Sequence, residues 1–405
     1  MTARTLAVED NPELLGCLPD GDHTFAWVRE GEGLVGWGEV ARVELTGPDH
    51  FSAAARWWEL TRAALDIDDA VGVPGTGPIA FASFAFDGRA ATSVVVVPRV
   101  LVGRRAGRSW ITVLDAADHP APPISAPAAI PQAPSDVHYS EGSRSAVQWQ
   151  AAVAEAVRRI SNGDLDKVVL ARDLVATASA AVDQRYLLRE LAGHYPSCWT
   201  FAVDGLVGAT PELLIRRTGS QVVSRVLAGT VNRLGDDVAD GALADALLDS
   251  DKDLAEHRIA VRSVAAALAD HCDELDVQAS PRILRLPNVQ HLATDVSGRL
   301  GDNATVLDLA RSLHPTAAVC GTPTDVALDL IRELEGMDRG RYAGPVGWLG
   351  ADGDGELGIA LRCAEVAGRR VRLFAGCGIV AGSDPMSELA EAQAKFVPIR
   401  DALGV

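Results

Sequence analysis

Apolar residues in the first third of the chain gather in short runs that favour β-strands. Valine, isoleucine, phenylalanine and tryptophan recur in these runs. The predicted strands are residues 24–29, 79–86, 93–101 and 109–114. Residues 51–65 instead repeat apolar side chains at helical spacing, and Trp57 and Trp58 give this segment an apolar face. The pattern predicts a β-rich N-terminal part, residues 1–118, that contains one helix.

The segment at residues 119–136 has a different composition, HPAPPISAPAAIPQAPSD. Proline fixes φ and lacks an N–H donor, so proline at this density prevents both helix formation and strand pairing. We therefore expect a linker or a long exposed loop between the N-terminal part and the remaining residues, 137–405.

The hydrophobic pattern is more regular in residues 137–405. Helices are predicted at residues 145–162, which end at an Asn-Gly pair, at residues 240–268, and from Asp384-Pro385 onward. Strands are predicted at residues 164–175, 199–203, 206–209, 213–217, 221–227, 342–349, 357–365 and 370–375. Because strands follow one another without regularly alternating helices, the sequence predicts an antiparallel α+β fold rather than a doubly wound one.

Composition and charge exclude several classes of protein. The chain has 405 residues, 48% apolar and 23% charged, which is ordinary for globular proteins. A formal charge of −18 argues against a nucleic-acid partner. The longest apolar runs, such as residues 94–97, are far shorter than the roughly 20 residues that a membrane helix needs. The first residues lack the apolar core of a signal peptide. We expect a cytoplasmic protein whose six scattered cysteines are reduced thiols.

Two pairs of acidic residues have the spacing that brings carboxylates together on a helix. Asp253 and Glu256 are three residues apart, as are Glu388 and Glu391. If the two helix faces meet, their carboxylates suit Mg²⁺, which prefers hard oxygen ligands. Helix N-termini also favour acidic residues without any metal, and Glu391 could simply pair with Lys395 four residues later. Spacing alone leaves both interpretations open.

A glycine run at residues 375–383, AGCGIVAGS, follows a predicted strand and precedes the last helix. Its backbone N–H groups could bind a carboxylate or phosphate, and a simple tight turn is an equal alternative. The spacing G-x-G-x-x-x-G and the lack of a following βαβ unit disfavour a nucleotide-dependent enzyme.

Lys167 occupies an unusual position in the predicted strand at residues 164–175. Alternation places it on one face with Val169 and Ala171, so a lysine lies among apolar side chains. A desolvated lysine can act as a base, and a partly buried glutamic acid such as Glu212 can act as an acid. Alternatively, Lys167 extends to solvent at the strand end and Glu212 follows a turn proline.

Nine segments, taken in order, resemble the chorismate-utilising enzymes, which include isochorismate, salicylate, anthranilate and aminodeoxychorismate synthases. The segments are DKVVLAR (166–172), GATPELLIRR (208–217), LAGTVNR (227–233), SDKDLAEHRI (250–259), NVQHLATDVSGRL (288–300), LHPTAAVCGTP (313–323), RYAGPVGW (341–348), ALRCAEV (360–366) and AGCGIVAGSDPMSELAE (375–391). The resemblance covers about residues 147–398. It implies the α+β fold of the anthranilate synthase large subunit, with antiparallel sheets forming a sandwich, helices outside, and the N-terminal part completing the same fold.

The resemblance also implies a role for each matching residue. Lys167 is similar to the base that activates water, and Glu212 to the acid that protonates the departing ring hydroxyl. Glu256 and Glu391 resemble magnesium ligands, supported by Asp253 and Glu388. The residues that resemble substrate contacts are Thr210, Gly229, Thr230, His291, Tyr342, Arg362, Gly376, Cys377, Gly378 and Lys395. For His291 a purely structural role is an equal alternative, and His257 and His314 are expected to be structural.

Two positions indicate water as the nucleophile. Ammonia-using relatives carry glutamine where this chain has Lys167, and aminodeoxychorismate synthases carry a lysine where it has Ala228. The resemblance therefore implies an isomerase, a Mg²⁺-dependent isochorismate synthase acting on chorismate. The alternatives are a salicylate synthase, which also eliminates pyruvate, and a non-catalytic chorismate sensor. We expect a monomer without a glutamine amidotransferase subunit, feeding a menaquinone or a siderophore pathway. In the last helix, Met386 and Leu389 differ from the residues that the relatives commonly carry at these positions.

Overall fold

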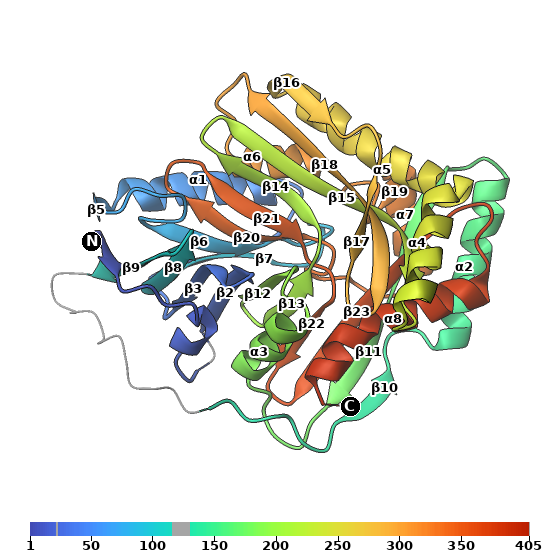
Figure 1. Ribbon diagram of the computed structural model, residues 1–405, viewed down its shortest axis with the longest axis horizontal. Coiled ribbons are helices and arrows are strands. Elements are labelled where there is room, and N and C mark those ends of the chain that lie inside the picture. Colours follow the sequence, from blue (N-terminus) through green and yellow to red (C-terminus); the bar gives the residue numbers. More distant parts are fainter. Residues whose placement is uncertain (22, 116–129, 405) are drawn as a thin grey trace.

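A computed structural model describes residues 1–21, 23–115 and 130–404. The described residues form two β-sheets, eight α-helices and one short 3-10 helix, η1 (Leu14–Cys17). The sheets lie against each other and the helices pack on their outer sides (Figure 1). The predicted α+β class is therefore confirmed. No helix in the described part of the chain is long and apolar enough to cross a membrane.

The larger sheet runs through both the N-terminal and the C-terminal parts of the chain. In spatial order it contains β10 (His138–Glu141), β11 (Lys167–Thr177), β23 (Arg370–Ile379), β22 (Cys363–Ala367), β13 (Leu206–Thr210), β12 (Trp199–Val203), β2 (Thr24–Arg29), β3 (Glu32–Trp37), β8 (Val100–Arg105), β9 (Arg108–Asp115), β1 (Thr2–Val8) and β5 (Asp66–Asp69), with β19 (Gly321–Thr322) beside β11. Its described pairings are antiparallel except for β1 with β5.

The smaller sheet likewise combines strands from both parts. Its order is β16 (Cys272–Val277), β18 (Val289–Leu300), β15 (Gln221–Asn232), β14 (Leu213–Thr218), β21 (Gly355–Ile359), β20 (Pro345–Gly350), β6 (Ile79–Ser83), β7 (Ser93–Val97) and β4 (Ala41–Leu45), with β17 (Arg282–Arg285) beside β18. Because residues 1–115 contribute strands to both sheets, they share one hydrophobic core with the remaining residues.

Aromatic and aliphatic side chains fill the space between the sheets. The rings of Phe25, on the larger sheet, and Phe81, on the smaller one, stack with centroids 5.4 Å apart. A second apolar cluster lies on the outer face of the larger sheet, where Leu187, Leu191 and Phe396 are buried. Burying such side chains stabilises the fold by about 1.5–3 kcal/mol each.

Helices cover the outer faces of both sheets. α1 (His50–Ala63) and α6 (Val306–Leu313) lie on the smaller sheet, and α5 (Asp251–Ala269), with α4 (Asp237–Asp249) before it, covers β15 and β18. α3 (Gln184–His194) and α8 (Pro385–Ala402) pack on the larger sheet, and α2 (Ala146–Ser161) and α7 (Thr324–Leu334) lie near β11. α2 begins after Ser145, which forms a capping box with Gln148, and its C-cap is Asn162, as the Asn-Gly pair predicts.

Three predicted elements are wrong because the chain breaks where one continuous element was expected. The helix predicted at residues 240–268 is two helices, since Ser250 is extended and its hydroxyl caps the second by accepting from Asp253 N–H. The strand predicted at 93–101 divides at Pro98 and changes sheets. The strand predicted at 357–365 also changes sheets, at residues 360–362, where Arg362 has φ 48°.

The glycine run is also different from its predicted form. Strand β23 continues through Gly376 and Gly378 to Ile379, and only residues 380–383 turn toward α8. Of the predicted proline-rich segment, residues 119–129 lie outside the described part, and residues 130–136 contain neither helix nor strand. Elements that the sequence analysis missed include β1, β3, β4, β16, β17, α3, α6 and α7.

Candidate active site

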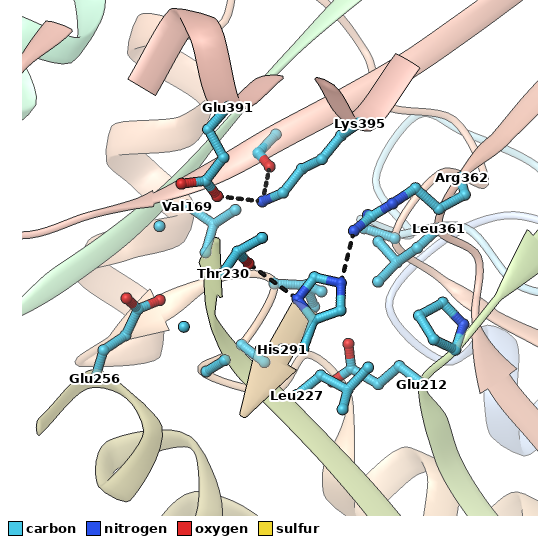
Figure 2. A pocket seen from close by; sticks show the side chains of 18 of the residues that line it. Val169, Glu212, Leu227, Thr230, Glu256, His291, Leu361, Arg362, Glu391 and Lys395 are labelled. Atoms are coloured by element: carbon cyan, nitrogen blue, oxygen red, sulfur yellow. Dashed lines mark hydrogen bonds and ion pairs between the residues drawn. The ribbon is translucent and has the colours of Figure 1, made fainter. Parts of the chain in front are cut away.

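Strands from both sheets and two helices surround one cavity that collects most of the predicted site residues (Figure 2). Of the sixteen residues, all except Lys167, Thr210 and Cys377 line this cavity; the thirteen are Glu212, Gly229, Thr230, Asp253, Glu256, His291, Tyr342, Arg362, Gly376, Gly378, Glu388, Glu391 and Lys395. They come from segments between residues 212 and 395, so only the fold brings them together. The three others lie directly behind the cavity wall.

Lys167 begins β11 and lies just behind the wall. Its side chain is 1% exposed, and its Nζ is 2.9 Å from Oε1 of Glu256, which does line the cavity. A Cβ at Gly378 would stand 2.5 Å from that oxygen and 2.9 Å from Lys167 Cε. Glycine at this point of β23 therefore leaves the space in which the lysine and the glutamate meet.

Glu212 follows the turn Thr210-Pro211 at the end of β13. Its side chain is buried, and it forms no ion pair within the described part of the chain. Burial raises the pKa of Glu212 to about 8, so the carboxyl group keeps its proton at neutral pH. The hydroxyl of Thr210 accepts a hydrogen bond from Glu212 N–H at 3.3 Å, which places Thr210 behind Glu212 as a support.

His291, on β18, links Thr230 to Arg362. Its Nε2 is 3.2 Å from Nη2 of Arg362, and its Nδ1 is 3.0 Å from the Thr230 hydroxyl. A guanidinium only donates, so Nε2 accepts and Nδ1 carries the hydrogen that Thr230 receives. This pattern requires a neutral imidazole. Burial, together with the positive charge of Arg362, lowers the pKa of His291 well below its ordinary value.

Among the residues that the structure describes, Arg362 has no carboxylate partner. Its guanidinium forms no ion pair with any described acidic residue, its Nε is buried without a hydrogen bond, and the residue is only 8% exposed. Its positive φ of 48° is strained for a residue with a side chain, and such strain is frequent at functional sites. A buried, uncompensated guanidinium facing a cavity is suited to binding an anion such as a carboxylate.

The end of β23 adds backbone groups to the same region. Lys395 Nζ donates to the carbonyl of Gly376 at 2.9 Å, so this peptide points away from β11. In an antiparallel strand the residue two positions on, Gly378, presents its peptide in the same direction, whereas Cys377 faces β11 and pairs with Leu170. β22 pairs with β23 only up to Leu373. The N–H groups of the two glycines therefore point past the end of β22.

The side chain of Cys377 lies outside the cavity, and its thiol donates to the backbone carbonyl of Glu388 at 3.3 Å. Tyr342 precedes β20 and stacks on Phe374, with ring centroids 5.1 Å apart. A Cβ at Gly376 would stand 3.2 Å from the Tyr342 hydroxyl, so this hydroxyl lies directly beside the glycine end of β23. Burial raises the pKa of Tyr342, which therefore stays a neutral donor.

Glu256 on α5 and Glu391 on α8 carry carboxylates that face the cavity (Figure 2), and Glu256 is the one that contacts Lys167. Glu388 and Glu391 place carboxylate oxygens within 4.8 Å of each other. Burial and the adjacent charge of Glu391 raise the pKa of Glu388 to about 7. Asp253 and Glu256 complete this acidic group, and Asp253 accepts from the Ser250 hydroxyl.

This donor set fits Mg²⁺. Its members are hard carboxylate oxygens on two rigid helices, as that ion prefers. The Cys377 thiol lies within the same 4.8 Å, but burial raises its pKa well above the ordinary value, so it stays a neutral, soft group outside the preference of Mg²⁺. Among the described residues, lysines balance three of the carboxylates: Lys167 contacts Glu256, Lys395 contacts Glu391 at 2.6 Å, and Lys252 stands 3.9 Å from Glu388.

Two charged cavity residues were missed by the sequence analysis, Lys252 and Arg339. A compositional signal could have identified the first. The chain has 37 basic residues, and only three of them are lysines: Lys167, Lys252 and Lys395. All three lie at this cavity or directly behind its wall. Every other Lys or Arg position in the chain is an arginine, so the rarity of lysine is itself a signal for residues of this site.

The fold and the cavity define an enzyme-like site for a small anionic molecule, with a neutral buried acid, a buried lysine and an uncompensated arginine. The comparisons with known proteins are more specific. Residues 16–404 match the family of chorismate binding enzymes, and the chain belongs to this family.

Relatives and solved structures agree with this placement. The isochorismate synthase DhbC of Bacillus subtilis is 44% identical over 265 residues, which cover 62% of this chain and 67% of that protein. The putative isochorismate synthase MenF of Mycobacterium tuberculosis is 40% identical over 345 residues, which cover 82% and 88%. The crystal structure of a putative 2,3-dihydroxybenzoate-specific isochorismate synthase, DhbC from Bacillus anthracis, superimposes with a TM-score of 0.81 at 33% identity and covers 97% of this chain and 100% of that chain.

Proposed function

We propose that this protein is a Mg²⁺-dependent isochorismate synthase that adds water to chorismate and expels the ring hydroxyl. One observation carries the proposal: a buried lysine and a buried, protonated glutamic acid serve one cavity that also holds an uncompensated arginine. Family membership and relatives named isochorismate synthases support the choice of substrate and product.

Binding comes first in the proposed mechanism. Chorismate carries two carboxylates, and Arg362 pairs with one of them through charge-assisted hydrogen bonds. His291, neutral and fixed by Thr230, holds the guanidinium without competing for its charge. The amides of Gly376 and Gly378, with the Tyr342 hydroxyl, offer further donors beside this position.

The second carboxylate falls to the acidic side of the cavity. Glu256 and Glu391 would hold Mg²⁺, with Asp253 and Glu388 in support. Bound there, the ion supplies positive charge to a substrate carboxylate in a region that otherwise repels it. Lys395 stays available to fix Glu391 and the Gly376 carbonyl.

The chemical step needs one proton removed and one delivered. Lys167 acts as the uncharged amine, so its Nζ takes a proton from the water whose oxygen bonds to the ring, and Glu212 donates its proton to the hydroxyl that leaves as water. One water enters and one leaves, so the product is an isomer of the substrate. Each positioned proton transfer contributes about 10²–10⁴-fold to the rate. Two separate residues suit the two proton transfers, because Lys167 lies on the larger sheet and Glu212 directly precedes β14 of the smaller sheet.

Incubation of purified protein with chorismate and Mg²⁺ tests the proposal, with products separated by chromatography. We expect isochorismate. The variants Lys167→Ala and Glu212→Ala should lose at least about 100-fold in kcat, because each removes one proton transfer, while chorismate binding measured by calorimetry remains. The matched control Glu333→Gln, an exposed change on α7, should keep the wild-type rate.

Other outcomes separate the competing functions. Salicylate and pyruvate would establish a salicylate synthase, and tight chorismate binding without turnover would establish a sensor. Unchanged kcat in either alanine variant would refute the assigned roles. The neighbouring genes would indicate whether the product enters a menaquinone or a siderophore pathway. We expect a cytoplasmic monomer without an amidotransferase subunit. Gel filtration of the active protein measures its oligomeric state.

A further inference from the structure

We propose that Glu335 and Arg339 are positioning residues that replace a missing strand beside β11 and thereby hold Lys167 in its working position. This inference rests on the proposed role of Lys167. The two residues lie four positions apart after α7, are 2% and 3% exposed, and form a buried ion pair in which Arg339 Nε donates to Glu335 Oε2 at 2.9 Å.

The edge of β11 explains why a replacement is needed. On one side β11 pairs with β23 along its length. On the other side β19 covers only Lys167 and Val168, and β10 begins pairing only at Leu174. The peptides of Val169 and Ala171 point toward this gap, where buried N–H and C=O groups need partners.

Side chains and one neighbouring carbonyl provide those partners. Arg339 Nη2 donates to the Val169 carbonyl at 2.8 Å, and Glu335 Oε1 accepts from Ala171 N–H at 2.7 Å. Trp149 Nε1 donates to the Ala171 carbonyl at 3.1 Å, and Val169 N–H donates to the carbonyl of Cys320 at 2.7 Å. The Glu335–Arg339 pair therefore binds the backbone of β11 at Val169 and Ala171. These residues lie two and four positions after Lys167, and their side chains share one face of the strand with it.

The pair also ties β11 to the rest of the cavity. Arg339 lines the cavity itself, and its Nη1 donates to the carbonyl of Val319, in the loop that forms the adjoining wall. Its guanidinium lies 4.1 Å from the centroid of the Phe86 ring, which fixes its plane. One guanidinium therefore sets the spacing between β11, the 319–320 loop and α7.

Lysine cannot reproduce this arrangement. It keeps the charge of arginine but has a single nitrogen, which cannot reach Glu335 and two separate carbonyls in one plane. Arg339→Lys should therefore fold, and Lys167 should shift relative to Glu256 and the substrate. A displacement of about 1 Å costs on the order of 100-fold in rate, so we expect a kcat loss of that size with KM changed less than threefold.

The matched control is Arg332→Lys. Arg332 is on α7, is 30% exposed, and its side chain pairs with Asp87 and Asp329 rather than with the backbone of β11. It should keep the wild-type kcat. Rates are compared well below the melting temperature of each variant, so that loss of folded protein does not imitate loss of kcat. Added guanidinium should restore Arg339→Ala severalfold and leave Lys167→Ala inactive.

The three lysines allow a direct structural readout. Protein labelled with [ε-¹³C]lysine gives three side-chain NMR signals, because the chain has three lysines. In Arg339→Ala the Lys167 signal should move while the Lys252 signal stays in place, whereas global destabilisation would affect all three. Wild-type kcat in Arg339→Lys, or three unmoved signals in Arg339→Ala, would overturn the inference. If the wild type itself leaves chorismate unchanged, the proposed function fails instead.

Discussion

Two glutamates in the same cavity, Glu212 and Glu256, are both shielded from solvent and yet differ in charge. Burial raises the pKa of Glu212 to about 8, and the weaker opposing charges of Lys167, Arg362 and Lys395 do not offset it. Burial acts in the same direction on Glu256, but Lys167, with its Nζ 2.9 Å away, together with Lys395 and Lys252 outweighs it and the pKa falls. Their surroundings, rather than their depth, decide which glutamate keeps its proton.

The same contrast separates the two sides of the cavity. The acidic side consists of Asp253, Glu256, Glu388 and Glu391, and its carboxylates outnumber the three lysines near them. The arginine side consists of Arg362, His291, Tyr342 and Glu212, where every group except the arginine is neutral at pH 7. A dianionic substrate can therefore pair one carboxylate with Arg362 on the arginine side, whereas its other carboxylate needs a bound metal cation on the acidic side.

Removing the cation of the arginine side should have the largest effect among the binding residues. Arg362→Met keeps much of the side-chain volume but removes charge-assisted hydrogen bonds of about 1.5–3 kcal/mol each, so KM for chorismate should rise by about 10²–10³-fold. Steady-state kinetics with saturating Mg²⁺ measures this. Arg299→Met, an exposed change on the strand that carries His291, is the control. An unchanged KM for Arg362→Met would show that the arginine does not receive a carboxylate.

Much of this contrast could be predicted from the sequence, although not its geometry. Ordered motifs identified all four acidic-side residues and all four arginine-side residues, and hydrophobic periodicity located most central strands and α2. Long-range contacts were beyond that reasoning. Residue spacing cannot reveal that Arg362 sits where the chain changes sheets, nor that His291 faces it 71 positions away in sequence.

Local breaks were also hard to predict. The hydrophobic pattern of residues 240–268 is helical throughout. The break between α4 and α5 depends on Ser250 acting as an N-cap, and a serine by itself does not reveal that a helix is interrupted. The Glu335–Arg339 pair carries an i, i+4 spacing that is typical of an exposed helix pair. Only the fold shows that this pair is buried against the open edge of β11.

On the acidic side, removing one carboxylate should weaken metal binding and leave chorismate binding to Arg362 intact. For Glu391→Gln we expect the Mg²⁺ concentration at half-maximal rate to rise by about 10–100-fold, since a charged oxygen ligand is replaced by a neutral one. Titration of activity with Mg²⁺ at fixed chorismate measures it. Glu274→Gln, which changes an exposed acid on β16, should give the wild-type curve. Equal Mg²⁺ curves for Glu391→Gln and the wild type would remove Glu391 from the metal site.

The difference between Glu212 and Glu256 also predicts a pH effect on stability, the smallest of these effects. The pKa of Glu212 is about 8 in the folded protein and 4.5 ordinarily, so between these values the folded state holds a proton that the unfolded state has released. Rising pH therefore favours unfolding, and the stability that comes from a protonated Glu212 declines from about pH 4.5 to about pH 8 and then levels off.

Glu212→Gln has no proton to lose at this position and should escape that decline. Urea denaturation of both proteins should show the wild type losing about 1–2 kcal/mol relative to Glu212→Gln between pH 6 and pH 7.5, within the limit of about 1.4 kcal/mol per pH unit for one proton. Glu333→Gln, on the surface of α7, should track the wild type. Parallel pH curves for wild type and Glu212→Gln would mean that Glu212 is ionised, like Glu256, and that the arginine side of the cavity does not hold a neutral acid.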